Sequence, residues 1–446
     1  MKRTTRIAIF CFVLLAVLAV VPLFISLDRY IPQIEQEISA KLKEPVKIKS
    51  LGIAALPLPH VTIDGIMVGK SGDVTVGKIT VMPDLWSLLG STKVIRDIKI
   101  DSLILTQKAI NKIPLWTGSA GGKAAQPQII IEKIHVDDAQ IQLDIGTLGP
   151  FDARVSLNAR GEPEDASITT KDGKLKVLIK PDRSNYLIDA SAKSWKLPVG
   201  PAILFDELAV QGVATLSDVN LSKVNGRLYG GTVGGKAIIG WRKGLQLKGN
   251  LNISRVELKS LVPLLAPGKR MSGMLSAAPV FSASAPSAKQ FANALRLETP
   301  FNVQSGVLYG VDVEKAATSL IKQGASGGET RFDQLSGHLV MERGNYRFTQ
   351  LQIASGALAA SGNVSISPKK ELSGRINAEV KAATLASAGV PLNVSGTLDS
   401  PLLLPTGASV AGAAVGTAVL GPGLGTSVGA KVGNWAEGLF GKKEEK

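Results

Sequence analysis

The sequence predicts a mainly β protein, an elongated and repetitive antiparallel sheet, and two observations lead to this fold class. First, residues 245–254 alternate strictly, with an apolar residue or glycine at every odd position and a polar residue at every even position. Successive side chains of a strand point to opposite faces, so this pattern predicts one apolar and one polar sheet face. Second, short strand-like runs, many with the same period, recur from residue 46 to residue 405.

An internal repeat supports a sheet that grows by the addition of similar strands. Gly231, Ala237 and Gly249 have the same spacing as three glycines that lie 125 residues further along the chain. Apolar residues around these positions match at the same offset. Repetition of β-units with one apolar face indicates a long sheet built by stacking strands.

The apolar face of such a sheet must be covered, because monomeric proteins seldom expose large contiguous apolar patches. The sheet either folds over as a sandwich with a filled core or curls into a trough that holds something apolar. Only 5% of the residues are aromatic, which favours the trough because small aliphatic side chains fill a thick core poorly. The candidate lining residues are Ile98, Ile100, Val155, Leu157, Leu245, Leu247, Leu251, Ile253, Val364 and Ile366.

The N-terminus predicts a membrane anchor. Residues 1–6 carry Lys2, Arg3 and Arg6, and residues 7–27 contain no charge. At about 1.5 Å per residue, a helix over 7–27 spans the roughly 30 Å hydrocarbon core of a bilayer. A cleaved signal peptide, the alternative, usually has a shorter apolar region and a small-x-small cleavage site. We therefore expect an uncleaved single-pass anchor, with residues 1–6 in the cytoplasm and the bulk of the chain on the other side of the membrane.

Beyond the anchor the sequence divides into four parts. Residues 28–119 form a first β region that begins with an amphipathic helix over residues 31–43. The other parts are a Gly/Ala/Gln linker at 120–128, a repetitive β region at 129–405 and a Gly/Ala-rich tail at 406–446. Further short helices are predicted over residues 257–265, 287–295 and 315–322.

After the anchor and the amphipathic helix, five motifs follow in order. They are Pro45-Val46-Lys47-Ile48, the run from Leu56 to Val68, Leu85-Trp86-Ser87-Leu88-Leu89-Gly90, the run from Val94 to Ile100 and the closing run from Pro391 to Pro401. Over essentially residues 1–405 this order resembles the AsmA family of envelope proteins in diderm bacteria. The resemblance implies a U-shaped β-groove attached to the inner membrane and extending into the periplasm. It also implies a link to outer-membrane homeostasis and phospholipid movement, without a catalytic motif.

The C-terminal tail has a composition of its own. From Pro401 to Ala430 there is no charged residue. Glycines recur there and just beyond at four-residue spacing, at Gly412 and Gly416 and at Gly421, Gly425, Gly429 and Gly433. Such spacing lets helices pack closely in membranes. We expect a helical tail that inserts into a membrane or docks on a partner, with a flexible low-complexity tail as the alternative.

Catalysis and metal binding find little support in the sequence. One cysteine excludes a Cys-based zinc site, and the three histidines stand in unrelated contexts. Residues 425–429 fit the G-x-S-x-G pattern, but no histidine follows Ser427 to complete a triad. His135, beside two aspartates, is interpreted as part of a turn or a solvated face. We expect no catalytic residue, no metal and no cofactor.

The net charge of +15 comes from 51 Lys and Arg against 36 Asp and Glu, scattered through the alternating strands. No nucleic-acid-binding motif is present, so anionic phospholipid or lipopolysaccharide is a more natural partner than nucleic acid.

The expected function is non-enzymatic lipid handling, in which an aliphatic face shields acyl chains for outer-membrane biogenesis. The expected partners are phospholipid or another membrane lipid, the inner membrane, the outer membrane through the tail, and further envelope proteins. The first alternative is an envelope scaffold or assembly factor that pairs an open sheet edge with strands of outer-membrane proteins. The second is a structural tether with a filled sandwich core.

Overall fold

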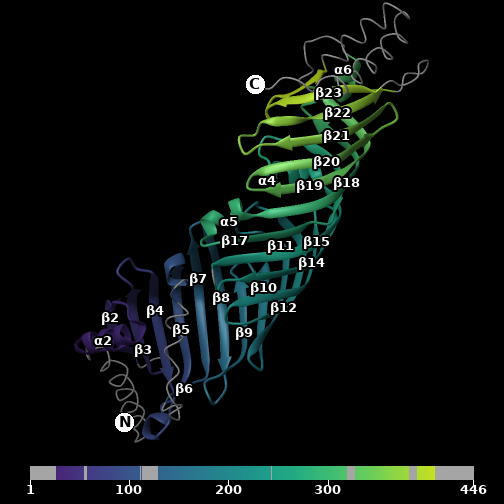
Figure 1. Cartoon of the computed structure of the whole chain (residues 1–446). Helices are drawn as coiled ribbons and strands as arrows, with labels where there is room; N and C mark the ends of the chain where they lie inside the picture. The colour runs from purple at the N-terminus through teal and green to yellow at the C-terminus, as the bar shows by residue number, and fades with distance from the viewer. Residues whose placement is uncertain are drawn as a thin grey trace, which may run out of the picture. The chain divides into compact units, whose positions relative to one another are not determined.

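Figure 1 shows the computed structural model, which describes residues 27–54, 58–110, 112, 129–242, 244–318, 327–380 and 389–406. The chain divides into two compact units. The first unit comprises Met1–Gly200 and Val210–Leu216, and the second unit comprises Pro201–Ala209 and Ser217–Lys446. Strand β12 (Leu204–Ala214) therefore has residues in both units.

Three expectations concern residues outside the described ranges. They are the anchor at 7–27, of which Leu27 is described, the linker at 120–128, and the tail at 406–446 with its glycines from Gly412 to Gly433, of which Thr406 is described. These expectations stay predictions. Within the described ranges, no helix combines the length and the hydropathy that crossing a bilayer requires.

The first unit begins with helices and continues as strands. Its helices are the 3-10 helix η2 (Asp28–Tyr30), the α-helix α2 (Ile31–Leu42) and the 3-10 helix η3 (Ser87–Leu89). Its strands are β1 (Val46–Lys47), β2 (Ser50–Ala54), β3 (His60–Val68), β4 (Val74–Pro83), β5 (Lys93–Thr106), β6 (Ile129–Ile131), β7 (Lys133–Leu143), β8 (Gly146–Leu157), β9 (Pro163–Thr170), β10 (Leu175–Asp182) and β11 (Asn185–Lys196). The helix predicted over residues 31–43 is confirmed as α2.

Most neighbouring strands of the first unit pair antiparallel. β1 and β2 both pair with β3, and the runs β3 to β5 and β7 to β11 continue through antiparallel neighbours. β5 instead pairs in parallel with β6 and with β7, so the sheet is mainly antiparallel, as predicted, but mixed at this point. A parallel pair needs a crossover of a dozen or more residues. The chain from residue 107 to residue 128 is long enough to be that crossover.

Helix α2 covers apolar side chains of β1 and β3 at the purple end of Figure 1. Its own apolar residues, spaced by three or four positions, pack against the buried side chains of Val46, Ile48 and Val68. These helix residues are Ile31, Ile34, Ile38 and Leu42. The helix ends where Lys43 adopts the left-handed conformation, with φ of 56°.

A buried carboxylate ties the segment after β5 to the turn between β3 and β4. The Asp73 side chain is 4% exposed and accepts hydrogen bonds from Lys112 Nζ and Ser71 Oγ, each at 2.8 Å. Lys112 also pairs with Glu44, just beyond α2, at 2.6 Å. The hydrogen bond from Lys112, followed by the one from Ser71, holds the pKa of the Asp73 carboxyl below its ordinary value. Three chain segments thus meet at one charged cluster.

The second unit continues with strands and short helices. Its helices are α4 (Leu258–Leu265), α5 (Ala288–Ala294) and α6 (Val313–Thr318). Its strands are β13 (Asp218–Leu228), β14 (Gly231–Gly240), β15 (Leu245–Glu257), β16 (Met271–Ala277), β17 (Val280–Ala285), β18 (Arg296–Tyr309), β19 (Glu329–Glu342), β20 (Asn345–Ala354), β21 (Leu358–Ile366), β22 (Leu372–Val380), β23 (Val390–Gly396) and β24 (Pro401–Pro405). The helices predicted over 257–265 and 287–295 are confirmed as α4 and α5. The one predicted over 315–322 begins earlier, as α6, and residues 319–322 lie outside the described ranges.

All pairings between the named strands of the second unit are antiparallel within the described residues. β16 and β17 share one position between β15 and β18. Pro279 separates them, because a proline donates no hydrogen bond to a sheet ladder.

The predicted repeat corresponds to two hairpins of this unit, β14–β15 and β21–β22. In the first hairpin Val233 pairs with Ile253. In the second, Leu358, the equivalent of Val233, pairs with Val380 rather than with Ala378. The register of the two hairpins therefore differs by two residues. An even shift keeps equivalent side chains on the same face.

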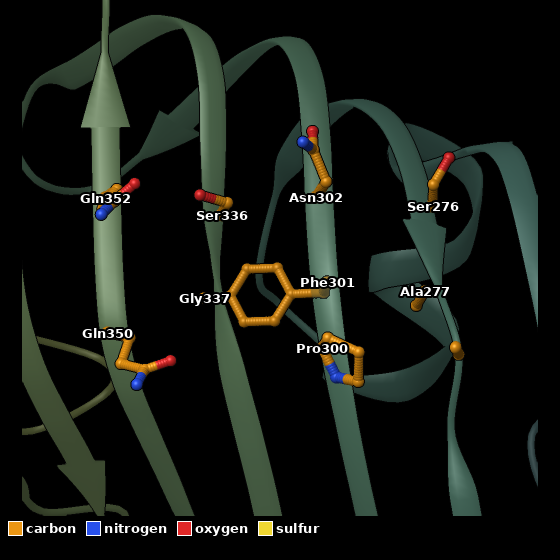
Figure 2. Close-up of a pocket in the computed structure, with 10 residues that line it drawn as sticks. Ser276, Ala277, Pro300, Phe301, Asn302, Ser336, Gly337, Gln350 and Gln352 are labelled. Atoms are coloured by element: carbon orange, nitrogen blue, oxygen red, sulfur yellow. The ribbon is translucent and has the colours of Figure 1, made fainter.

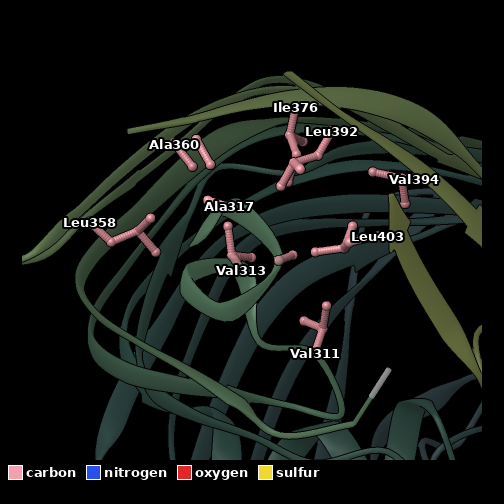
Figure 3. Packing of buried hydrophobic residues seen from close by; sticks show 11 residues of the cluster. Val311, Val313, Ala317, Leu358, Ala360, Ile376, Leu392, Val394 and Leu403 are labelled. Atoms are coloured by element: carbon pink, nitrogen blue, oxygen red, sulfur yellow. The ribbon is translucent and has the colours of Figure 1, made fainter. Parts of the chain in front are cut away.

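Helix α6 buries an apolar cluster under the last strands of the second unit. Figure 3 shows the strands arching over the helix that carries Val313 and Ala317. From the strands, Leu358, Ala378 and Leu392 complete this cluster at 2%, 0% and 0% exposure. Helix α4 fills a second cluster through Leu258 and Leu261. The strand residues of that cluster are Leu228, Val256, Val303, Phe332 and Leu335.

A long-range contact shows that the sheet of the second unit curls. Lys269, between α4 and β16, donates a hydrogen bond to the Leu398 carbonyl oxygen at 2.6 Å and pairs with Asp399 at 2.6 Å. Five strands separate β16 from β23 in pairing order. At about 4.8 Å per strand, a flat sheet would hold β16 and β23 about 29 Å apart. The contact therefore requires the sheet to bend back on itself.

The charged cluster at Asp73 predicts an acid-dependent loss of stability in the first unit. The carboxyl has a pKa lowered by folding, so its contribution is complete above the unfolded-state pKa of about 4 and is lost as the pH falls through the folded-state value. Asp73→Asn should lower the free energy of unfolding at pH 7 by about 1–3 kcal/mol and should flatten its dependence on pH below about 4. Chemical unfolding of both proteins from neutral to acidic pH measures this difference. Equal pH dependence in the two proteins would contradict the role given to Asp73.

Candidate functional site

Two rows of aliphatic side chains cross the first unit from β2 to β11. Each row takes one residue from each strand except β6, and each step joins residues that are direct partners in the sheet. The first row is Ile53, Val61, Val81, Ile98, Ile134, Val155, Ala166, Ile179 and Ile188. The second row is Leu51, Ile63, Ile79, Ile100, Val136, Ala153, Ile168, Val177 and Ala190. We call the surface formed by both rows the aliphatic face.

The aliphatic face is incompletely covered. Apart from Leu51, which is buried, every residue of the two rows is half-buried. A strand of a closed sandwich buries such residues almost completely, as Leu392 does under α6. Ile63 packs against the cluster that α2 covers. For the other half-buried residues of the rows, neighbouring side chains of the same face account for partial burial. The surface therefore offers apolar area to a ligand.

The opposite face of the same strands is polar. Thr62, Thr80, Lys99, His135 and Arg154 form the row that lies between the two aliphatic rows in register. Lys99 pairs with Asp137 at 3.1 Å and with Asp101 at 3.2 Å, and the hydrogen bonds that its ammonium group donates to these two carboxylates raise its pKa. His135 Nδ1 lies 2.8 Å from Asp97 Oδ1. The first unit is thus apolar on one face and charged on the other.

The residues proposed from the sequence separate into three environments. Ile98, Ile100 and Val155 belong to the rows, and Leu157 follows Val155 on the same face of β8. Leu245, Leu247, Leu251 and Ile253 share one face of β15 and are half-buried; of these, Ile253 packs against the α4 cluster. Val364 packs against the α6 cluster, and Ile366 pairs with Tyr346 and Leu372.

The structure adds residues that inspection of single strands missed. Ile134 and Val136 join β7 to the rows, Ile168 joins β9, and Val177 and Ile179 join β10. In β10 the sequence shows a run of three apolar residues, Val177 to Ile179, flanked by Lys176 and Lys180. Only the pairing register shows that Val177 and Ile179 continue the rows of β5.

One protein-family model matches the central part of the chain. The model of the AsmA family matches residues 138–351. This central part of the chain is similar to the AsmA family. A search among curated proteins found no match to the chain. The AsmA match contains β8 to β19, in both units, together with parts of β7 and β20.

The extent of the AsmA match differs from that of the resemblance noted in the sequence. The motifs that carried the resemblance lie before residue 101 and after residue 390, outside the matched range. The resemblance was expected over essentially residues 1–405, and the family model confirms it over residues 138–351, a shorter and more central part of the chain.

Within the AsmA-matched range, three phenylalanines face glycines of neighbouring strands. The pairs are Gly249 with Phe281, Gly306 with Phe332 and Gly337 with Phe301. Figure 2 shows the Phe301 ring directed at Gly337. A Cβ atom on Gly249 would lie 2.6 Å from the Phe281 ring, so a larger residue has no room there. Each ring therefore lies close to the backbone of the adjacent strand, which keeps the side-chain layer thin.

A separate hollow lies on the polar side of β16, β18, β19 and β20 (Figure 2). It has a volume of about 670 Å³, and its lining includes Ser276, Asn302, Ser336 and Gln352. Alternation along the strands directs these side chains away from the aliphatic ones. The side chains that line the hollow include hydroxyl and amide groups but no acid or base. It lacks the groups needed for acid–base chemistry, so the aliphatic face remains the stronger candidate site.

Two leucines of the second unit, Leu392 and Leu247, differ in burial. We therefore predict that replacing each with alanine lowers the free energy of unfolding by a different amount. Leu392→Ala removes a fully buried side chain from the α6 cluster and should lower the free energy of unfolding by about 2–5 kcal/mol. Leu247→Ala removes the same atoms from a half-buried position outside both clusters and should lower it by about 1 kcal/mol. Denaturant unfolding of the two variants tests this. Equal losses would mean that a second layer covers Leu247.

Proposed function

We propose that this protein binds the acyl chains of membrane lipids along the aliphatic face and acts without catalysis. One observation carries the proposal: two rows of aliphatic side chains run in register across nine strands, and all of them except Leu51 are only half-buried. A protein that has no ligand for such a surface gains nothing from leaving it uncovered.

The dimensions of the rows suit acyl chains. Nine strands at about 4.8 Å spacing give each row a length of about 38 Å. One leaflet of a bilayer is about 15 Å deep in its hydrocarbon part, so a row is long enough for more than one acyl chain. Burial contributes about 0.8 kcal/mol for each CH₂ group, which amounts to roughly 13 kcal/mol for a chain of about sixteen carbons before ordering costs.

In this mode of binding, the acyl chains and the headgroup of a lipid lie in different surroundings. The aliphatic rows contact hydrocarbon, while a headgroup stays in water beyond the edge of the face. The charged opposite face stays hydrated through side chains such as Lys99 and Arg154. Binding of this kind needs a continuous apolar surface and no reacting group.

The similarity to the AsmA family supports a role in the bacterial envelope. We place the protein in the inner membrane through residues 7–27, with the bulk of the chain in the periplasm, where it would move phospholipid for outer-membrane biogenesis and homeostasis. The uncharged run that directly precedes Asp28 supports this location.

The alternative function, addition of client strands to an open sheet edge, finds less support. β24 pairs with β23 and with no other named strand among the described residues, so it is a candidate edge. Pro401 and Pro405 begin and end this strand. Because prolines lack an N–H donor, they hinder the addition of a further strand.

Photo-crosslinking of the full-length protein in its membrane tests the proposal. Ile179→benzoylphenylalanine places the reactive group on the aliphatic face, and Lys180→benzoylphenylalanine places it one residue further on, on the opposite face. We expect position 179 to crosslink to phospholipid severalfold more than position 180, as measured by mass spectrometry of the irradiated protein.

A second pair of adjacent positions serves as the replicate. Val177→benzoylphenylalanine and Lys176→benzoylphenylalanine should repeat the difference. Equal lipid crosslinking from both faces, or none from either, would sink the proposal. Crosslinks from positions 177 and 179 to other proteins would favour the scaffold function.

A further inference from the structure

The ends of β2 to β6 display a group of exposed apolar side chains that packing does not explain. Trp86 and Leu89, in the loop from β4 to β5, are 82% and 85% exposed. The same loop carries Leu85 and Leu88, and the adjoining strand ends add Leu58 and Ile129, which are 63% and 57% exposed. We call these six residues the apolar rim.

Strand pairing places the rim at one end of the first unit's strands. Ala54 pairs with His60 next to Leu58, and Pro83 pairs with Ile95 at the base of the loop. Lys93, the first residue of β5, pairs with Ile129. Segments distant in sequence therefore bring their exposed apolar residues to the same edge.

Hydrogen bonds hold the backbone of the loop that carries Trp86. The Asp84 carboxylate accepts hydrogen bonds from the backbone N–H groups of Trp86 at 2.9 Å and Ser87 at 3.1 Å. Ser87 Oγ accepts a hydrogen bond from the Val94 N–H at 2.8 Å, and Arg96 pairs with Asp84. The hydrogen bond from Arg96 also holds the pKa of the Asp84 carboxyl below its ordinary value.

A further contact closes the other side of the loop. Lys93 Nζ donates hydrogen bonds to the carbonyl oxygens of Leu88 at 2.6 Å and Gly90 at 2.8 Å. These bonds fix the backbone from residue 84 to residue 94 while the side chains of Trp86 and Leu89 face water. A loop fixed in this way presents its apolar side chains to a partner without the ordering cost of a flexible one.

Two observations indicate that this partner is a lipid bilayer. Tryptophan and leucine beside basic residues are typical of side chains at a membrane interface, and Lys93 and Arg96 border the rim. In addition, the uncharged run at residues 7–27 ends next to Asp28, whose carboxylate accepts a hydrogen bond from the Leu51 N–H at 3.3 Å. Leu51 lies three residues before Ala54 on β2, about 10 Å from the rim end of that strand.

We propose that the apolar rim rests in the surface of a phospholipid bilayer, with Trp86 and Leu89 in the interface. The rim is thus a second membrane contact, distinct from the expected anchor. The first aliphatic row begins beside it, because Val81 precedes Pro83 by two residues and Ile98 follows Ile95 by three. A lipid that leaves the bilayer at the rim would meet that row first. This last consequence rests on the proposed function, whereas the docking of the rim does not.

A fluorescent label on the rim of the full-length protein tests the docking. In a Cys11→Ser background, Leu89→Cys carries the environment-sensitive dye NBD on the rim. Lys70→Cys carries it on the exposed turn between β3 and β4, at the opposite ends of those strands. Both proteins are reconstituted into vesicles of phosphatidylcholine and phosphatidylglycerol, with and without brominated acyl chains.

We expect bromine to quench the dye at position 89 severalfold more than at position 70, and the emission at position 89 to shift to shorter wavelength. Equal quenching at the two positions overturns the proposal. A dye at position 89 that is shielded from aqueous iodide but not quenched by brominated lipid also overturns it, because a protein surface then covers the rim.

Two further measurements separate this result from that of the lipid-binding proposal. Circular dichroism and thermal unfolding check that Leu89→Cys folds like the unmodified protein, as its 85% exposure leads us to expect. Crosslinking from position 179 reports on the aliphatic face and not on the rim, so either proposal can fail while the other stands.

Discussion

Apolar surface is stable in water when another surface covers it, and both units are arranged around this constraint. Alternation gives the strands one apolar face, and the chain inserts short helices to cover parts of it. α2 covers the first strands, and α4 and α6 fill two clusters in the second unit. Where no helix is inserted, as over most of the two aliphatic rows, the same kind of side chain stays half-exposed.

The polar face explains why the first unit does not close into a sandwich through its other side. Antiparallel sheets tolerate one hydrated face, and here that face carries Lys99 between two aspartates and His135 beside Asp97. A second sheet stacked on these groups would have to remove water from several charges, which is costly. The apolar face is therefore the one that can be covered without removing water from charges.

The aliphatic face and the apolar rim complement each other within the first unit. One is a surface wide enough for acyl chains, and the other is an edge suited to a bilayer, and the first row adjoins that edge through β4 and β5. The glycine and phenylalanine pairs of the AsmA-matched range lie in a different environment. Their rings lie close to the backbone of neighbouring strands, and Phe332 is buried in the cluster that α4 fills.

The sequence by itself determined the strands, the single apolar face and the short helices, because side-chain direction along a strand or helix is a local property. It therefore identified Ile98, Ile100 and Val155 before any pairing was known. It did not determine the parallel pairing of β5 with β7, since that contact joins segments on either side of a long crossover. It also did not distinguish Val364 from Ile98, two aliphatic residues in similar patterns. The tertiary structure decided that the first packs against the α6 cluster and that the second joins the aliphatic rows, because the surroundings of a residue depend on which distant part of the chain lies beside it.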